Sequence, residues 1–218
     1  MRLILFIILG GGFLSVNGYQ EYIVSSKTKN TPSATKLVDI EKGNKITNNY
    51  LILDEHWAFY SSCVYYYKTS KYDKEVKDSS TVEYAYYPAL SIEHPYIIQL
   101  GKLEEKYGDL SKVPEGQFPK LENIDVLIKT EKFKTVGDIP AYIDTKKNMT
   151  GLVINSINSL NDDEKRLIQE SFPKVNFNKV VIIEEGREPS STTSSFAMMG
   201  GGVFIIFIGI AVAFKGRD

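Results

Sequence analysis

The sequence predicts an α+β fold, with one mixed, hairpin-rich β domain that carries a C-terminal βαβ unit and is flanked by N- and C-terminal transmembrane helices. Uncharged runs stand near both ends of the 218 residues, aromatic and β-branched segments fill the first half between them, and a strand–helix–strand pattern fills the last third. With 43% hydrophobic and 24% charged residues, the composition is that of an ordinary folded chain.

The first apolar run spans Leu3–Leu14, directly after Met1 and Arg2. A short basic start, an apolar stretch of this length and the small residues up to Gly18 fit a secretory signal peptide. Tyr19, Tyr22 and their apolar neighbours favour a retained helix instead, because aromatic rings gather at membrane interfaces. Residues 1–24 are therefore an N-terminal transmembrane helix or a signal peptide, and both alternatives place residues 25–190 outside the cytoplasm.

The second apolar run, residues 196–214, is free of charged residues and follows a Ser/Thr-rich linker at 191–195. A helix of this length covers about 28 Å at 1.5 Å per residue, which is close to the hydrocarbon thickness of a bilayer. Basic residues follow at once, so residues 215–218 are expected to be a cytoplasmic tail. Glycine triplets in the two runs predict an antiparallel pair of closely packed helices: Gly10, Gly11, Gly12 and Gly200, Gly201, Gly202.

Between the runs, a helix is expected from the Thr31 cap to Gly43, and a short strand over 50–54. Residues 57–68 and 81–90 are dense in aromatic and β-branched side chains, which predicts two strands of a long hairpin. Pro88 is expected to end the ladder or to lie at a sheet edge, since it has no N–H to donate.

The second half of the domain starts with weaker signals, a marginal helix over 103–110 and a strand over 125–130. The last third is clearer. Residues 151–157 and 179–185 are predicted strands, and Asn161 with Glu164 forms a capping-box pattern before the helix between them. A strand, a helix and a strand in this order predict a βαβ unit with parallel strands and a right-handed crossover.

Composition excludes several classes of function. The formal net charge of −1 gives no basic face for nucleic acid, so no nucleic-acid partner is expected. A single cysteine excludes an internal disulfide and every multi-cysteine metal site. No spacing typical of a metal or phosphate site is present, so neither metal nor cofactor is expected.

Three side chains are candidates for chemistry: Cys63, His56 and His94. A cysteine beside a histidine can act as a nucleophile, because the histidine raises the thiolate fraction. Cys63 lies in an apolar segment without a family-specific signature, which favours a small buried side chain. The alternative to a non-enzymatic protein is thus a membrane-bound hydrolase or redox protein that uses Cys63 or the two histidines, or a membrane-proximal ligand sensor.

Tyrosines are unusually frequent in the predicted hairpin. Adjacent residues of a strand point to opposite faces, so one face of the sheet is expected to present tyrosine beyond the core. Tyrosine is favoured at protein interfaces, whereas cross-strand ring pairing would make the same residues structural. The candidate interaction residues are Tyr65, Tyr66, Tyr67, Tyr84, Tyr86 and Tyr87.

Three segments carry a resemblance: NTPSATKLVDIEKG at 30–43, SSCVYYYK at 61–68 and EEGREPSS at 184–191, just before the last apolar run. With the two apolar ends, this layout resembles uncharacterised bacterial membrane proteins that have a two-helix anchor and one extracytoplasmic domain. The start of the first segment and CVYYYK are also similar to the membrane-bound domain of GIDE-like proteins, although no RING finger follows. The resemblance implies a β-barrel-like core beside the membrane and transfers no catalytic residue.

Together these features predict a membrane-anchored extracytoplasmic domain that is not an enzyme. It is expected to bind or scaffold another envelope component. Its partners are then the lipid bilayer and a membrane or envelope protein, with the domain on the periplasmic side if the organism is bacterial.

Overall fold

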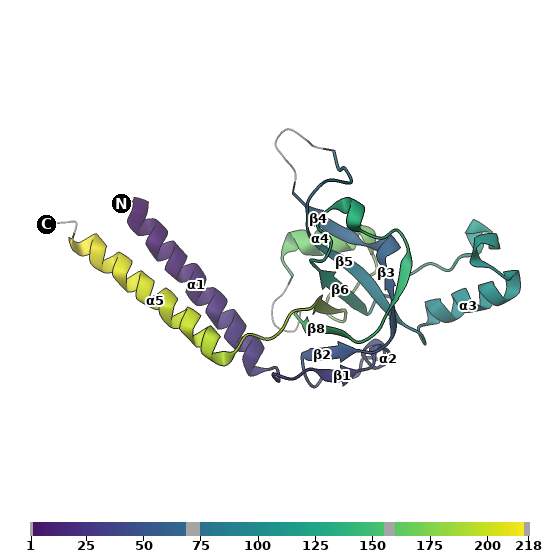
Figure 1. Cartoon of the computed structure of the whole chain (residues 1–218), viewed down its shortest axis with the longest axis horizontal. Helices are drawn as coiled ribbons and strands as arrows, with labels where there is room; N and C mark the ends of the chain where they lie inside the picture. Colours follow the sequence, from purple (N-terminus) through teal and green to yellow (C-terminus); the bar gives the residue numbers. More distant parts are fainter. Residues whose placement is uncertain (1, 69–74, 155–159, 216–218) are drawn as a thin grey trace. The chain divides into compact units, whose positions relative to one another are not determined.

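The computed structural model describes residues 2–68, 75–154 and 160–215 (Figure 1). The chain divides into two compact units. We call the first the helical unit, which comprises Met1–Thr31, Asn48–Tyr50 and Glu188–Asp218. The second, the sheet unit, comprises Pro32–Thr47 and Leu51–Arg187.

Two long helices form the helical unit, α1 (Arg2–Ser26) and α5 (Thr192–Lys215), and they lie side by side (Figure 1). Among the described residues, one helix is long and apolar enough to cross a membrane, Thr192–Phe214 within α5. Only 11% of its most apolar stretch is buried, unlike the core helix of a soluble protein. The predicted linker at 191–195 is mostly helical, because α5 begins four residues before the apolar run.

A curled mixed sheet forms the body of the sheet unit, with helices packed on it, so the α+β prediction is confirmed at that level. The described strands follow the order β1-β2-β8-β9-β6-β5-β3-β7, and β4 pairs with β5 beside that path. Their bounds are β1 (Ser33–Thr35), β2 (Tyr50–Leu53), β3 (His56–Phe59), β4 (Val64–Tyr67), β5 (Val82–Ser91), β6 (Val126–Thr130), β7 (Ile143–Lys146), β8 (Met149–Val153) and β9 (Val181–Glu185).

The predicted hairpin is present, since β4 and β5 pair antiparallel with Val64 opposite Tyr86. The first arm is not one strand, because a 3-10 turn at Tyr60–Ser62 separates β3 from β4. The expectation for Pro88 is confirmed for the ladders and wrong for the strand: the pairing with β4 ends at Tyr86 and the pairing with β6 ends at Pro88, but β5 itself continues to Ser91. Pro88 lies where one edge of β5 changes its partner from β4 to β3, so a missing N–H donor costs little there.

The prediction of a parallel βαβ unit is wrong. β8 and β9 pair antiparallel, with Val153 opposite Ile183, so the connection between them leaves and returns at the same end of the ladder. The parallel neighbour of β9 is β6, with Val126 opposite Val181. β8 ends at Val153, and the last part of the predicted strand, residues 155–157, lies outside the described residues.

The described part of the sheet unit contains three α-helices. The helix expected from Thr31 begins only at Leu37, because β1 precedes it and the Asp54 carboxylate accepts a 2.8 Å hydrogen bond from Leu37 N; it is α2 (Leu37–Glu41). The marginal helix is longer than predicted and begins at Pro95 after a His94 cap; it is α3 (Pro95–Tyr107). The capping box of Asn161 and Glu164 is confirmed at the start of α4 (Asp162–Ser171).

Apolar clusters cover both faces of the sheet. On one face, Leu37 and Ile40 of α2 pack with Leu51, Tyr87 and other strand residues. On the opposite face, Ile168 of α4 and Phe172 after it pack with Leu127 and Ile182, among others. Both faces of the central strands are therefore covered by packed side chains.

Candidate functional site

The structure corrects the tyrosine prediction at two positions. Tyr86 and Tyr87 are fully buried, each on a different face of β5, so neither is available to a partner. The Tyr86 hydroxyl donates to Glu164 Oε1 at 2.7 Å. The Tyr87 ring packs edge-on against Tyr60, and its hydroxyl lies 3.5 Å from Glu185 Oε2. Burial raises the pKa of both tyrosines well above the ordinary value.

Three of the six tyrosines form a row on one face of the hairpin. Tyr66 stacks on Tyr84 with ring centres 5.4 Å apart, and Tyr84 meets Tyr86 edge-on at 5.8 Å. Lys129 Nζ lies 4.6 Å from the centre of the Tyr84 ring. Tyr66 is the most exposed of them, at 44%. This row is the cross-strand ring pairing considered above, and its rings face one another rather than an open surface.

Tyr65 and Tyr67 lie together on the same strand, with ring centres 6.0 Å apart. Both side chains are half-buried. Of the six candidates, Tyr66 therefore offers the largest exposed fraction, and the set does not form one continuous recognition surface.

Cys63 is a free thiol. Its side chain is half-buried and packs against the apolar cluster that contains Leu37 and Ile40 of α2. Burial raises its pKa to about 12, which suppresses the thiolate that a nucleophile needs. The thiol donates a weak hydrogen bond to Val64 O at 3.8 Å. This environment is that of a packed side chain, as the apolar surroundings of Cys63 in the sequence indicated.

The two histidines have local structural contacts. His56 is fully buried, and its Nδ1 lies 2.8 Å from Asp54 O. Its Nε2 has no hydrogen-bond partner among the residues that the structure describes, and burial lowers the pKa of the ring. His94 caps α3, since its Nδ1 accepts from Tyr96 N at 3.2 Å. Among the described residues, no group of three or more His, Cys, Asp or Glu side chains is placed to hold a metal ion.

Of the two glycine triplets, only Gly11 of α1 and Gly202 of α5 lie in close contact with each other. An added Cβ on Gly202 would lie 2.5 Å from Gly11 O, and one on Gly11 would lie 2.7 Å from Gly202 O. Within the described part of the chain, Gly10, Gly12 and Gly200 have nothing within 4 Å of such a Cβ and so do not contribute, and for Gly201 the nearest atom is at 3.9 Å. Two glycines that the sequence reasoning missed also approach closely, Gly18 against Met199 and Gly209 against Ile8.

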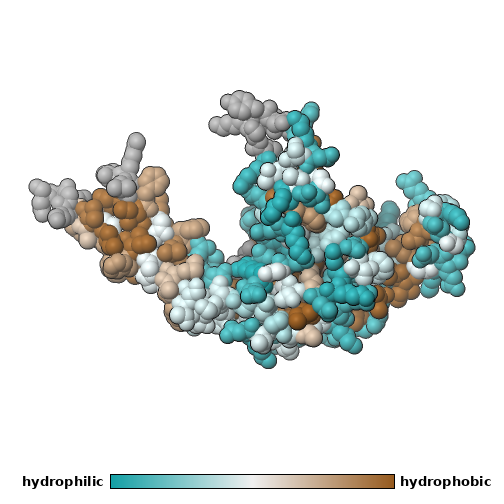
Figure 2. Space-filling view, in the orientation of Figure 1, coloured by the Kyte–Doolittle hydropathy of each residue, from teal (hydrophilic) through white to brown (hydrophobic). Residues whose placement is uncertain are grey.

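A groove of about 240 Å³ lies between α3 and the face of β3 and β7, and we call it the α3 groove. All thirteen residues of α3 are half-buried or exposed, although the helix is amphipathic. Figure 2 shows hydrophobic surface where α3 adjoins the rest of the sheet unit. The groove is lined by Trp57, Phe59, Ile97, Leu100, Gly101, Glu104, Leu110 and Ile143.

Sequence reasoning did not find this groove, although part of its signal was present. Ile97, Leu100, Gly101 and Glu104 recur with helical spacing after the cap at His94, but the helix was expected to begin only at residue 103. The strand β7 was not predicted at all, because IDTK is short and polar.

The lining of the α3 groove is chemically suited to apolar groups. Aromatic rings and aliphatic side chains form its walls, and Glu104 is the one charged residue of its lining. An apolar wall without convergent donors or nucleophiles recognises shape and hydrophobicity rather than a reacting group.

Comparison with known proteins identifies no relative of this chain. No family model, no curated protein and no solved structure matches the chain. The resemblance to GIDE-like and other bacterial membrane proteins therefore stays a prediction.

Proposed function

We propose that this protein is a membrane-anchored binding protein whose sheet unit captures an apolar segment of another envelope protein in the α3 groove. The observation that carries the proposal is the exposure of α3. An amphipathic helix normally buries its apolar side, and this one leaves Leu100 and Ile97 beside an open groove. A partner segment that filled the groove would complete the burial.

The anchor in this proposal consists of both long helices. The apolar run in α5 is long enough to span a bilayer, and α1 packs along it through Gly11, Ser15 and Gly18. Cleavage of a signal peptide near Gly18 would remove this matched surface, which supports a retained α1. Large apolar side chains face outward from both helices, among them Phe6 at 72% and Phe207 at 64% exposure. Lipid is the environment in which such exposure is favourable.

The proposed topology follows from the basic residues at the two chain ends. Arg2 precedes the first apolar run, and Lys215 and Arg217 follow the second. Two antiparallel helices bring the start of α1 and the end of α5 to the same side, which is the cytoplasmic side by the positive-inside rule. The sheet unit then lies on the opposite side of the membrane, which is the periplasm in a bacterium.

A hydrolase or redox function centred on Cys63 has weaker support. Burial raises the pKa of the Cys63 thiol to about 12, whereas reactive cysteines have lowered pKa values. His56 is buried with its Nδ1 engaged by the backbone, and His94 is engaged as a helix cap. These contacts support a protein that binds rather than reacts.

Affinity purification of the full-length protein in mild detergent tests the proposal. Leu100→Gln removes a groove-lining side chain, and Ile98→Gln makes the same type of change on the same helix outside the groove lining. A partner should co-elute stoichiometrically with the wild type and with Ile98→Gln. Leu100→Gln should reduce its recovery about tenfold, since burying one leucine contributes at least that factor to affinity.

Equal recovery from all three proteins, or no partner from any of them, would overturn the assignment of the α3 groove. Equal melting temperatures of the two variants control for unfolding.

A further inference from the structure

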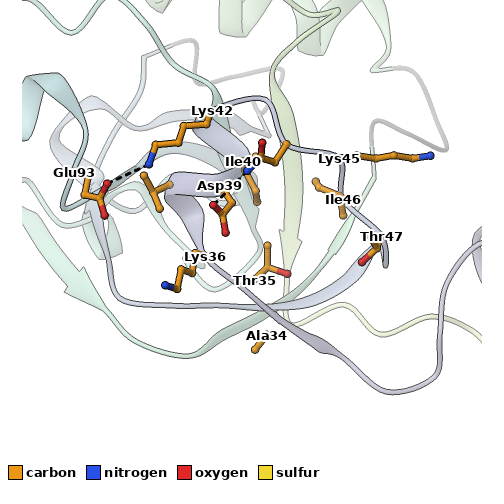
Figure 3. Close-up of a pocket in the computed structure, with 12 residues that line it drawn as sticks. Ala34, Thr35, Lys36, Asp39, Ile40, Lys42, Lys45, Ile46, Thr47 and Glu93 are labelled. Atoms are coloured by element: carbon orange, nitrogen blue, oxygen red, sulfur yellow. Dashed lines mark hydrogen bonds and ion pairs between the residues drawn. The ribbon is translucent and has the colours of Figure 1, made fainter.

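A polar concavity of about 540 Å³ surrounds α2, but its charged side chains do not converge on one point. Lys45 points away from Asp39, and Lys42 already pairs with Glu93 at 3.3 Å (Figure 3). A buried ionisable group lies elsewhere in the sheet unit, at His56 of β3. Because the strands around His56 also line the α3 groove, its protonation state bears on the proposed binding function.

The hydrogen bond of His56 fixes where its proton lies. Nδ1 is 2.8 Å from the carbonyl oxygen of Asp54, and a carbonyl can only accept, so Nδ1 carries the hydrogen and donates it. Nε2 then holds a lone pair that is sealed from solvent and has no hydrogen-bond partner among the described residues. A further proton would bind at this nitrogen. It would create a buried donor without an acceptor, on a ring that has become a cation.

The carboxylates around His56 are already engaged by other groups. Glu185 of β9 pairs with Lys132. On the β5 side, Glu41 of α2 accepts at 2.8 Å from the backbone N–H of the residue opposite His56. The Asp54 carboxylate accepts from the first N–H of α2 at 2.8 Å. Desolvation outweighs the attraction of the nearby carboxylates and lowers the pKa of the ring, so the fold disfavours the protonated form.

A lysine lies directly opposite His56 on the neighbouring strand. β3 and β7 pair antiparallel with His56 opposite Lys146, so the two side chains lie on the same face of the sheet. Lys146 Nζ is 2.9 Å from Asp144 Oδ2 and 5.5 Å from the centre of the Tyr60 ring. Like charges directly opposite each other destabilise a pair of strands. Protonation of His56 therefore acts against the pairing of β3 with β7.

β7 is an edge strand. It stands at the end of the strand order and pairs with β3, and its side chains are exposed or half-buried. Thr145 N donates to Asp144 Oδ1 at 2.9 Å rather than to a further strand. β8 follows β7 in the chain but pairs with β9, so β7 can separate from β3 without β8. Exposed edge elements open locally at a lower free-energy cost than central strands.

The same edge strand forms part of the wall of the α3 groove. Ile143 of β7 lines the groove together with Trp57 and Phe59 of β3. Trp57 lies opposite Thr145 in the β3–β7 register. Separation of the two strands would therefore break the wall that an apolar partner segment would contact.

We propose that protonation of His56 releases β7 from β3, so that the α3 groove holds its partner near neutral pH and releases it in mild acid. Control of the partner rests on the proposed function, whereas the release of β7 does not. In the released state the ring titrates near its ordinary pKa of about 6.5, so the paired state is favoured above that pH and loses stability below it. One linked proton raises the released population by at most about tenfold between pH 7.5 and pH 5.5.

Hydrogen–deuterium exchange of the full-length protein in detergent tests the release. Exchange is measured at pH 7.5 and pH 5.5 and corrected for the intrinsic effect of pH on amide exchange. Protection of the β7 amides should fall severalfold in acid, while the central strands β6 and β9 keep theirs. Trp57 is the one tryptophan of the sequence, and its fluorescence emission should shift to longer wavelength over the same pH range.

Two histidine variants assign the response. His56→Gln removes the buried ring, and His94→Asn removes the other histidine but keeps a side-chain acceptor at the cap of α3. The acid response of β7 should disappear in His56→Gln and persist in His94→Asn. The same response in both variants, or none in the wild type, would overturn the role of His56. If His56→Gln does not fold, the wild type decides, because equal loss of protection in β6, β7 and β9 would overturn a local release.

Partner recovery separates this proposal from the proposed function. The complex is captured by affinity purification at pH 7.5 and washed at pH 5.5. The wash should elute the partner from the wild type and leave it on His56→Gln. A partner that stays on the wild type although β7 is released would overturn the control of binding. Absence of any partner at pH 7.5 would contradict the proposed function, and the exchange experiment would still decide the release of β7.

Discussion

Glu164 holds α4 to the sheet through contacts in three directions. Its Oε2 accepts from Asn161 N at 3.0 Å in the capping box, and its Oε1 accepts from the Tyr86 hydroxyl at 2.7 Å. Lys129 Nζ lies 3.4 Å from the same Oε1, and both charged side chains are largely buried. A buried carboxylate persists only when its oxygens are satisfied, so each of these donors is needed.

Replacing Tyr86 with phenylalanine should destabilise the protein. Tyr86→Phe keeps the buried ring and removes one hydrogen bond to a charged acceptor, which lowers the free energy of unfolding by about 1.5–3 kcal/mol. Tyr66→Phe is the matched control, because that tyrosine is 44% exposed and should change stability by less than about 0.5 kcal/mol. Chemical denaturation measures both. Equal effects of the two variants would contradict the role of Tyr86.

The buried His56 predicts a loss of stability in mild acid. Burial lowers the pKa of its ring below the unfolded value of about 6.5, so the folded protein binds fewer protons than the unfolded chain. The free energy of unfolding should therefore fall as pH decreases below about 6.5. The variant His56→Gln has no titrating ring and should show a flatter profile between pH 7 and pH 5 in the same denaturation experiment. Parallel profiles would show that His56 does not couple stability to pH.

At the scale of elements, the two long helices give the sharpest test of packing. Gly202→Leu places a side chain against Gly11 O, where even a Cβ would lie 2.5 Å away, so the helices must separate. Gly200→Leu, in the same triplet, meets open space. The melting temperature in detergent should fall for Gly202→Leu and stay near the wild type for Gly200→Leu. Equal melting temperatures would contradict the packing of α1 on α5.

Local signals in the sequence predicted some elements well. The cap of α4 depends on Asn161 and Glu164, which are three residues apart, and the structure contains this capping box. The direction of β9 relative to β8 depends on long-range pairing, and the shared strand–helix–strand order does not distinguish the two directions. The sequence predicted that β4 and β5 pair, but it did not predict the register of that pairing.

The alternation of side chains along a strand predicts which face a residue lies on, but it does not predict whether that face is exposed. Alternation correctly puts Tyr86 and Tyr87 on opposite faces, but apolar clusters cover both faces, so both tyrosines are buried. The α3 groove depends on how α3, β3 and β7 come together, and one of these strands had no signal in the sequence. A site assembled from separate elements needs the fold before it can be recognised.

At the scale of the whole molecule, we propose a helical pair that anchors the protein in a membrane and a sheet unit that binds a partner. The apolar stretch of α5 and the outward-facing phenylalanines support the first part. The α3 groove supports the second. The proposed binding function needs no catalytic group, because an apolar partner segment is held by shape and hydrophobicity.

Photo-crosslinking in native membranes tests the binding claim most directly. A photoreactive amino acid replaces Ile97, which lines the α3 groove, and in a second protein it replaces the neighbouring Ile98, which does not. The account predicts that Ile97 gives one discrete crosslinked adduct and that Ile98 gives little or none. Equal crosslinking from both positions, or no adduct from Ile97 in membranes that retain the protein, would contradict a binding function for the groove.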